Sequence, residues 1–283
     1  MARAHIIDGT AIAKEIREET AEQIAKLGIT PGLAVILAGD DPASVRYVRI
    51  KQKAAAAAGI DIHVYKLPEN TKQNELMESI AFLNADKHVH ALLVQLPLPA
   101  HLDEDAAIAR MDPKKDVDGF HPENINAFME GRASVAPGLV MGIVQLITAT
   151  KEPLAGKAAV IVAKSREFTD TLSHALSAFG ITSQVARPDT EDLAQKTQSA
   201  DIVVTAVGAP GWLTADIVHE GAILIDVGTT DVNGAITGDV HPSCKEKAGW
   251  ISPVPGGVGP MTVAMLLKNT AMRAREASHA DAE

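Results

Sequence analysis

The first third of the chain alternates between helical and strand-like spacing of apolar residues. The pattern predicts helix 10–27, strand 33–38, helix 42–58, strand 60–67, a helix around 76–83 and strand 89–96. Thr10 can cap the first helix, which Gly28 follows. Asp41 and Pro42 predict an N-cap and a proline in the first turn of the second helix. Because strands separated by helices pair in parallel, this segment predicts an α/β fold.

The second half repeats this organisation from about Gly156 onward. Apolar runs predict strands 158–162, 181–186, 201–207 and 222–227, and the segments between the first three are long enough for helices. Asn233 and Gly234 predict a tight hairpin turn, and a last helix is expected from Met261 onward. A repeated strand–helix unit is typical of a nucleotide-binding sheet.

Composition narrows the classes of function. The 283 residues allow one large or two medium domains. A formal net charge of −10 argues against a nucleic-acid surface, whereas an anionic small substrate stays possible because its binding depends on the local field. Cys244 is the only cysteine, which excludes an internal disulfide and a multi-thiolate metal site. No apolar stretch is long enough to span a membrane and no signal-peptide pattern opens the chain, so we expect a soluble, cytoplasmic protein.

Tyr47 and Lys51 lie four residues apart on the predicted helix 42–58, so both side chains project from one face. The alanine-rich stretch 54–58 lets this helix pack closely against a neighbour. A lysine partly desolvated in such a cleft has a depressed pKa and can accept or donate a proton near neutral pH. A surface lysine beside a core tyrosine explains the same spacing, and the spacing alone favours that simpler explanation.

Two further polar residues stand where a ligand could meet them. Gln95 precedes Leu96 and Pro97 at the carboxyl end of a predicted strand, where open α/β sheets bind ligands, although a satisfied core amide is the alternative. Asp118 lies in the acidic loop 116–119, which lacks the rest of an EF-hand, so calcium is not expected. A carboxylate there could accept paired N–H bonds from a ligand ring, or could be a solvated loop acid.

The segment 253–262 contains three glycines and three prolines within eight residues, directly before an apolar helix. Because glycine leaves no side chain in the way of a ligand, the exposed backbone amides of this loop favour a ligand contact over a purely structural turn. The ten histidines are scattered without the spacing of a zinc site, so no metal is expected.

Five sequence blocks, taken together, resemble the methylenetetrahydrofolate dehydrogenase/methenyltetrahydrofolate cyclohydrolase family. They occur in family order and spacing: YVRIKQK at 47–53, VQLPLP at 94–99, KDVDGFHP at 115–122, DVG at 226–228 and PVPGGVGPMT at 253–262. The second, third and last blocks are highly specific. The blocks span most of the chain, so chance agreement of all five is negligible.

The resemblance implies a role for each matched position. Tyr47 would stack on the pterin, Lys51 would be the central acid/base group, and Gln95 would hydrogen-bond that lysine. Asp118 would hold the amino-pyrimidine edge of the pterin. The glycine-rich loop would close over the folate through Gly257, Val258, Gly259 and Pro260.

The same resemblance implies an architecture and a reaction. It predicts two α/β domains with the folate cleft between them: a folate-binding catalytic domain of residues 1–121 plus 261–283, and a Rossmann-like NAD(P)-binding domain of residues 122–260. Methylene-tetrahydrofolate would lose hydride to NADP, and water would convert the resulting methenyl cation to formyl-tetrahydrofolate. The expected partners are tetrahydrofolate derivatives and a second copy in a homodimer, with no nucleic acid and no membrane.

Two segments depart from the family pattern. Before the helix that enters the nucleotide domain, the family has Pro-Cys-Thr-Pro-x-Gly, whereas this chain has PGLVMG at 137–142. After the first strand of that domain, the family has Gly-Arg-Ser-x-Ile-Val-Gly-x-Pro, whereas this chain has AKSREFTDT at 163–171. Ala163 and Thr169 replace the two glycines and would crowd a pyrophosphate that glycine lets approach, whereas Lys164, Ser165 and Arg166 could still hold a phosphate. Thr229 replaces an apolar residue next to the expected nicotinamide site.

These departures leave two versions of the function open. The protein is either a bifunctional, NADP-dependent dehydrogenase and cyclohydrolase, or a monofunctional cyclohydrolase with a decayed nucleotide site. A non-catalytic folate-binding paralogue is disfavoured, because a pure binder has little use for Lys51. A generic dinucleotide-dependent dehydrogenase is disfavoured as well, because the Gly-x-Gly-x-x-Gly fingerprint is absent.

Overall fold

The computed structural model describes residues 3–132 and 135–280. These residues form two compact units, each built from two separate chain segments. One, named the 139–262 unit, contains the N-terminal segment up to Ala13 together with Leu139–Thr262. The other, named the 14–138 unit, contains Lys14–Gly138 together with the C-terminal segment from Val263. The predicted two-part α/β organisation is confirmed.

The 14–138 unit contains a parallel three-stranded sheet in the order β3-β2-β4. Its strands are β2 (Gly32–Ala38), β3 (Asp61–Leu67) and β4 (Ala91–Val94). Successive side chains of a strand point to opposite faces of its sheet. Alternate residues of β2 therefore enter two different cores, with Leu33, Val35 and Leu37 in one and Ala34, Ile36 and Ala38 in the other.

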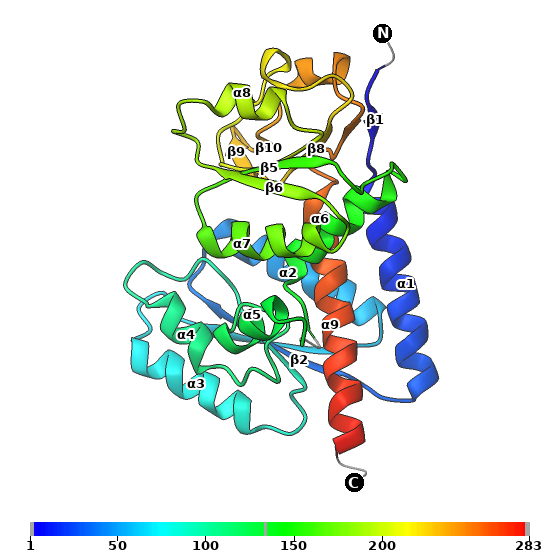
Figure 1. The fold of residues 1–283 in the computed structure, drawn as a ribbon. Helices are drawn as coiled ribbons and strands as arrows, with labels where there is room; N and C mark the ends of the chain where they lie inside the picture. Colours follow the sequence, from blue (N-terminus) through cyan, green and yellow to red (C-terminus); the bar gives the residue numbers. More distant parts are fainter. Residues whose placement is uncertain (1–2, 133–134, 281–283) are drawn as a thin grey trace. The chain divides into compact units, whose positions relative to one another are not determined.

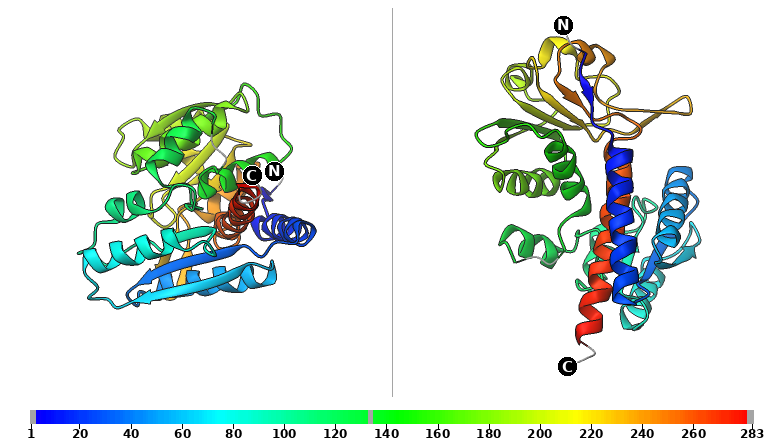
Figure 2. Two further views of the ribbon diagram at one scale, coloured as in Figure 1. Left: turned by 90° about the horizontal axis from the view of Figure 1, so that it is seen from below. Right: turned by 90° about the vertical axis from the view of Figure 1, so that its right-hand side faces the viewer.

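Helices cover both faces of this sheet. One face packs against α1 (Gly9–Leu27), α2 (Pro42–Ala57) and α9 (Val258–Ala280), which contribute Ile24, Val48 and Leu267 to a shared core. Within this unit α1 and α9 run side by side (Figure 2). The other face packs against α3 (Gln73–Ala85) and α4 (Glu104–Arg110), where the residues whose spacing predicted α3 are fully buried, namely Leu76, Ile80 and Leu83.

The two helix starts that the sequence predicted differ in outcome. Asp41 Oδ2 accepts a hydrogen bond from Ser44 N at 2.7 Å, and Pro42 begins α2, as predicted. The prediction that Thr10 caps α1 is wrong. Asp8 Oδ1 accepts from Ala11 N at 3.0 Å, and the helix already includes Thr10, because the aspartate two residues earlier supplies the capping acceptor.

The 139–262 unit contains a parallel six-stranded sheet in the order β1-β11-β8-β7-β5-β6. The strands are β1 (His5–Ile6), β5 (Ala158–Ala163), β6 (Thr182–Ala186), β7 (Ile202–Ala206), β8 (Ile223–Asp226) and β11 (Trp250–Ile251). The chain runs from β5 outward to β6 and then returns to the opposite side of β5 as β7. Such a reversal of strand order is where open α/β sheets bind ligands, and it confirms the Rossmann-like prediction.

Helices of this unit connect the strands. α6 (Gly138–Ala149) precedes β5, α7 (Arg166–Ser177) packs against β5 and β6 (Figure 1), and α8 (Leu193–Gln198) precedes β7. The predicted hairpin is formed by β9 (Thr230–Val232) and β10 (Ala235–Thr237), with positive φ at Asn233 and Gly234. Two 3-10 helices complete the unit, at Ala215–Ile217 and Pro242–Glu246.

Some elements differ from the predicted ranges. The strands β1 and β11 are each two residues long, too short for a periodic pattern to indicate them. The helix α5 (Pro122–Met129), which follows the acidic loop 116–119, was not among the predicted elements. The last helix starts at Val258 and not at Met261, because Pro260 fits the first helical turn, where its missing N–H is not needed.

Candidate active site

Lys51 and Gln95 meet at the carboxyl end of the three-stranded sheet. Lys51 lies on α2, and Gln95 follows the last residue of β4. Lys51 Nζ donates a hydrogen bond to Gln95 Oε1 at 3.0 Å. The backbone N–H of Gln95 donates to Ile36 O at 2.9 Å, and its Nε2 donates to Leu96 O at 2.6 Å. The amide is therefore held by its own backbone and by its nitrogen, with its oxygen facing the lysine.

Asp118 is the charged neighbour of this lysine. Burial lowers the pKa of Lys51 below its ordinary 10.5, while the negative charge of Asp118 acts in the opposite direction. Burial raises the pKa of Asp118 above 3.8, Lys51 opposes that increase and the carboxylate of Asp116 adds to it. Because removal from water disfavours a charge, burial pushes both groups toward their neutral forms. A lysine in this state can act as a proton acceptor nearer to neutral pH than an exposed one.

A fully buried carboxylate, Asp116, holds the loop that carries Asp118. Its oxygens accept hydrogen bonds from Gly119 N at 3.0 Å, His121 N at 2.8 Å and Asn124 Nδ2 at 2.9 Å. The sequence analysis missed this role. The Asp-x-x-Gly spacing could have indicated it, because aspartate side chains bind backbone N–H groups of the residues that follow in a turn.

The same loop is anchored to two helices. On α9, Asn269 Nδ2 donates to Val117 O at 2.8 Å and to Ala136 O at 3.2 Å. At the end of α3, Lys115 Nζ donates at 3.0, 2.7 and 2.7 Å to the carbonyl oxygens of Leu83, Asn84 and Asp86. Asp118 is thus presented by a segment with fixed backbone on both sides.

The structure brings most of the predicted catalytic set together. Lys51 contacts Gln95 directly and interacts with Asp118 through charge. Tyr47 is partly buried and lies one helical turn before Lys51, so the two share a face of α2. These four side chains come from α2, the end of β4 and the loop before α5, all within the 14–138 unit.

The predicted nucleotide-binding turn joins β5 to α7 at the reversal of strand order. Ala163 ends β5 and is buried, whereas Lys164, Ser165 and Arg166 are exposed. Ser165 caps α7, with its Oγ accepting from Phe168 N at 3.2 Å. Two exposed cationic side chains at a helix N-terminus fit an anionic phosphate, because the helix dipole and both charges attract it.

The two residues that replace family glycines in this turn lie inside the fold. Ala163 pairs with Ala206 in the sheet. Thr169 is buried, and its hydroxyl donates to Arg166 O at 2.9 Å. The exposed surface of the turn is therefore formed by residues 164–166. Arg166 also forms an ion pair with Asp170 at 3.3 Å, which offsets part of its charge.

The remaining predicted residues lie at two further segments of the 139–262 unit. Thr229 is exposed directly after the 226–228 block that ends β8. Val258, Gly259 and Pro260 form the first turn of α9. A Cβ added to Gly257 would come within 2.6 Å of Pro253 O, whereas a Cβ on Gly259 would meet no atom within 4 Å. Packing therefore requires glycine at 257, and the space beside 259 is open to an approaching ligand.

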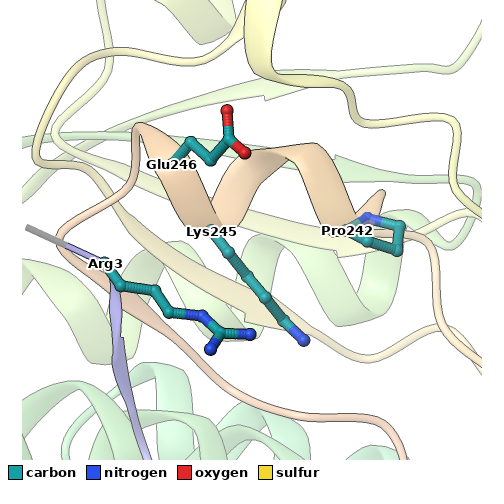
Figure 3. A pocket seen from close by; sticks show the side chains of 4 residues that line it. All are labelled: Arg3, Pro242, Lys245 and Glu246. Carbon is teal, nitrogen blue, oxygen red and sulfur yellow. The ribbon is translucent and has the colours of Figure 1, made fainter. Parts of the chain in front are cut away.

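A hollow elsewhere on the 139–262 unit contains none of these residues. It is lined by Arg3, Pro242, Lys245 and Glu246 (Figure 3). Within residues 3–132 and 135–280, no three His, Cys, Asp or Glu side chains are placed to hold a metal ion. In the same residues, no helix combines the length and the apolar character needed to cross a bilayer.

Two family models match the chain. The model described as tetrahydrofolate dehydrogenase/cyclohydrolase, catalytic domain, matches residues 7–118. The model described as tetrahydrofolate dehydrogenase/cyclohydrolase, NAD(P)-binding domain, matches residues 137–278. Together the two matches cover most of the chain.

Individual proteins show the same likeness over nearly their full length. "Bifunctional protein FolD" of an Exiguobacterium species is 45% identical over 271 residues, which cover 94% of this chain and 97% of that protein. The solved bifunctional FolD of Campylobacter jejuni has a TM-score of 0.92 at 42% identity and covers 96% of this chain and 99% of its own. The Trypanosoma brucei FolD, solved with NADP and an inhibitor, has a TM-score of 0.93 at 36% identity. The match covers 98% of this chain and 99% of that protein.

Proposed function

The chain belongs to the tetrahydrofolate dehydrogenase/cyclohydrolase family, and from this premise we propose that it carries out both reactions of that name. It oxidises methylene-tetrahydrofolate with a nicotinamide cofactor and then hydrolyses the methenyl product to formyl-tetrahydrofolate. The observation that carries the proposal is the hydrogen bond from Lys51 to Gln95 beside Asp118.

The hydrolytic half uses Lys51 as a proton carrier. Water adds to the methenyl carbon of the cationic substrate, and the neutral Lys51 amine accepts the proton that this water releases. The ring carbon–nitrogen bond then breaks as Lys51 returns this proton to the departing nitrogen. The hydroxyl proton of the intermediate leaves to solvent, and the carbon becomes a formyl group on the other nitrogen. A neutral amine suits this task because an ammonium group would repel the cation, and burial favours the neutral form.

The neighbours of Lys51 orient it and the pterin. Gln95 holds the amine through its fixed amide oxygen. Tyr47 stacks on the pterin from the same helix face, and Asp118 accepts hydrogen bonds from its amino-pyrimidine edge. Gly257, Val258, Gly259 and Pro260 supply a close-fitting backbone to the folate, which the open space beside Gly259 supports.

The dehydrogenase half needs a dinucleotide, which accepts hydride from the methylene carbon when bound. Lys164, Ser165 and Arg166 would hold its phosphates at the N-terminus of α7, directly after Ala163, the buried last residue of β5. Their two cationic side chains favour NADP, whose additional phosphate increases the attraction. Thr229 would border the nicotinamide.

A monofunctional cyclohydrolase is the alternative that the altered turn suggested. The bifunctional version is favoured over it, because relatives at about 45% identity over nearly the whole chain are named bifunctional. The exposed cations of the 164–166 turn agree with this choice.

Separate assays of the two half-reactions on the purified protein test the proposal. With methylene-tetrahydrofolate, we expect reduction of NADP in preference to NAD. With methenyl-tetrahydrofolate, we expect hydrolysis above the uncatalysed rate. Hydrolysis without reduction of either cofactor would select the monofunctional enzyme, and folate binding without turnover would select the non-catalytic paralogue.

Three further assignments follow from the family resemblance. Residues 1–121 plus 261–283 bind folate and carry the hydrolytic chemistry, and residues 122–260 bind the cofactor. The protein acts in the cytoplasm as a homodimer. Analytical ultracentrifugation tests the assembly, and a monomer at micromolar concentration would contradict the homodimer. Fractionation of the source cells tests the location.

A further inference from the structure

Two buried aspartates lie beside the reversal of strand order in the 139–262 unit. Asp226 ends β8, and Asp239 follows the β9–β10 hairpin; their exposed fractions are 3% and 0%. The sheet register pairs Asp226 with Thr205 of β7, so these two residues lie at the carboxyl ends of neighbouring strands, and the Asp239 carboxylate accepts a hydrogen bond from Thr205. A buried carboxylate persists only where donors compensate for the lost water, and these donors are loop N–H groups.

Asp239 fills a concave turn made by residues 207–209. Its Oδ2 accepts from Val207 N at 2.7 Å and Gly208 N at 3.3 Å, and its Oδ1 accepts from Ala209 N at 2.8 Å. Gly208 has φ +74, and successive N–H groups in such a turn form a nest for an anion. The anion here is a carboxylate of the chain itself. The Asp239 carboxylate thus fixes the conformation of the turn after β7.

Asp226 holds the segment that carries Asp239. Its Oδ1 accepts from Gly228 N and from Asp239 N, both at 3.0 Å, and its Oδ2 accepts from Val240 N at 2.8 Å. A Cβ on Gly228 would overlap the Asp239 carboxyl group, and a Cβ on Gly238 would overlap that of Asp226. The two acids therefore interlock the turns after β7 and β8 through segment 238–240.

Thr205 extends this network to an aromatic side chain. Its hydroxyl donates to Asp239 Oδ2 at 2.8 Å and accepts from Trp212 Nε1 at 3.0 Å. Trp212 is one of two tryptophans in the chain, and the other, Trp250, donates to Glu152 at 3.2 Å. The indole of Trp212 consequently reports on the state of Asp239.

We propose that Asp239 and Asp226 are positioning residues of the dehydrogenase reaction, which fix turns 207–209 and 226–229 in the form that receives the nicotinamide dinucleotide. The inference rests on the proposed dehydrogenase activity and adds to it the residues that shape its cofactor wall. It does not extend to hydrolysis, because Lys51, Gln95 and Asp118 belong to the other unit.

Asp239→Asn tests this role with minimal change in shape. An amide can keep its oxygen toward Val207 N and Thr205, but it then turns an N–H toward Ala209 N, so one donor faces another. We expect the cofactor KM to rise about tenfold to a hundredfold, while methenyl hydrolysis stays within about twofold of wild type. In a Trp250→Phe background, the emission of Trp212 should shift. Glu220→Gln, an exposed carboxylate-to-amide control in the same unit, should change none of these values.

A second pair of variants keeps the test decisive if Asp239→Asn does not fold. Thr205→Val removes only the hydroxyl and should reproduce a smaller rise in cofactor KM, and Thr205→Ser should restore the wild-type value. Loss of both activities in equal proportion would show a merely structural role and overturn the proposal, as would an unchanged cofactor KM in folded variants. If wild type binds NADP without reducing it, the proposed dehydrogenase activity fails, and weaker NADP binding by Asp239→Asn would still support the positioning role.

Discussion

Replacing Lys51 with methionine removes the amine while keeping an unbranched side chain on α2. The hydrogen bond of 3.0 Å to Gln95 Oε1 is lost, and Asp118 loses the cation that opposes the increase in its pKa. Methionine and lysine have similar helix propensities, so α2 should keep its conformation. The substitution therefore separates the chemistry of the amine from the folding of the helix that carries it.

The expected effect on hydrolysis is large. A positioned general acid–base group contributes ~10²–10⁴-fold to a rate, which corresponds to about 3–5 kcal/mol of transition-state stabilisation. We assign this acid–base role to Lys51 of the 14–138 unit. Methenyl hydrolysis should therefore fall by at least about a hundredfold, with the folate Kd nearly unchanged because Tyr47 and Asp118 remain.

The expected effect on stability has the opposite sign. Burial lowers the pKa of Lys51 in the folded protein, so the folded state binds this proton less well than the unfolded chain. The ammonium group therefore destabilises the fold as pH falls below the unfolded value of 10.5, and the full cost is present below the folded pKa. Methionine removes that cost, which offsets the loss of a hydrogen bond worth about 1 kcal/mol. The melting temperature at neutral pH should stay near that of wild type or exceed it.

Three measurements check this prediction. Loss of the methenyl absorbance follows hydrolysis, calorimetric titration with an unreactive folate analogue gives binding, and circular dichroism gives the melting temperature. Lys53→Met is the matched control, since Lys53 is exposed on the same helix and should be dispensable. Hydrolysis within about tenfold of wild type would refute the role of Lys51 as proton carrier. Folate binding lost together with activity would instead show that the amine holds the substrate.

Three further outcomes follow from the same geometry. Asp118→Asn should raise the folate KM about tenfold to a hundredfold. Because the Asp118 charge raises the pKa of Lys51, its removal should also move the rising limb of the hydrolysis pH profile to lower pH. A limb shifted to higher pH would contradict this. Asp116→Ala should lower the free energy of unfolding by about 3 kcal/mol or more in urea titrations, since three donors lose their acceptor. Burial raises the pKa of Cys244 to about 11, so a thiol reagent should label it only after denaturation; labelling of the native protein at the same rate would show that it opens.

The buried strands were the most predictable part of the fold. The apolar runs at 33–38 and 158–162 lie within β2 and β5, because strands covered on both faces need continuous hydrophobic sequence. The strands β1 and β11 were not predictable. They are held by pairing between distant parts of the chain, with His5 opposite Trp250, and no local pattern encodes such a partner.

The candidate site was predictable where its residues stand in short sequence motifs. It was not predictable where a carboxylate accepts hydrogen bonds from backbone N–H groups that are distant in the sequence. The helix spacing alone favoured a surface lysine, and Lys51 and Gln95 were singled out by the family blocks that contain them; the structure joins the two side chains. Asp239 could not be singled out, because a buried acid that accepts loop N–H groups is indistinguishable in sequence from an acid in solvent, whereas the Asp-x-x-Gly spacing could have indicated Asp116. Their roles depend on which loop N–H groups the fold brings to each carboxylate.

The order in which the chain leaves the ribosome conflicts with the order in which its units can be completed. Residues 14–138 are synthesised early, yet their core also contains Leu266, Leu267 and Ala271 of the last helix. Domains that consist of one continuous segment can fold as they emerge. Here the 14–138 unit cannot complete its core before α9 has been synthesised, and its apolar surface must be kept from aggregating until then. A nonsense mutation shortly after residue 262 would therefore damage the half of the protein that is encoded earliest.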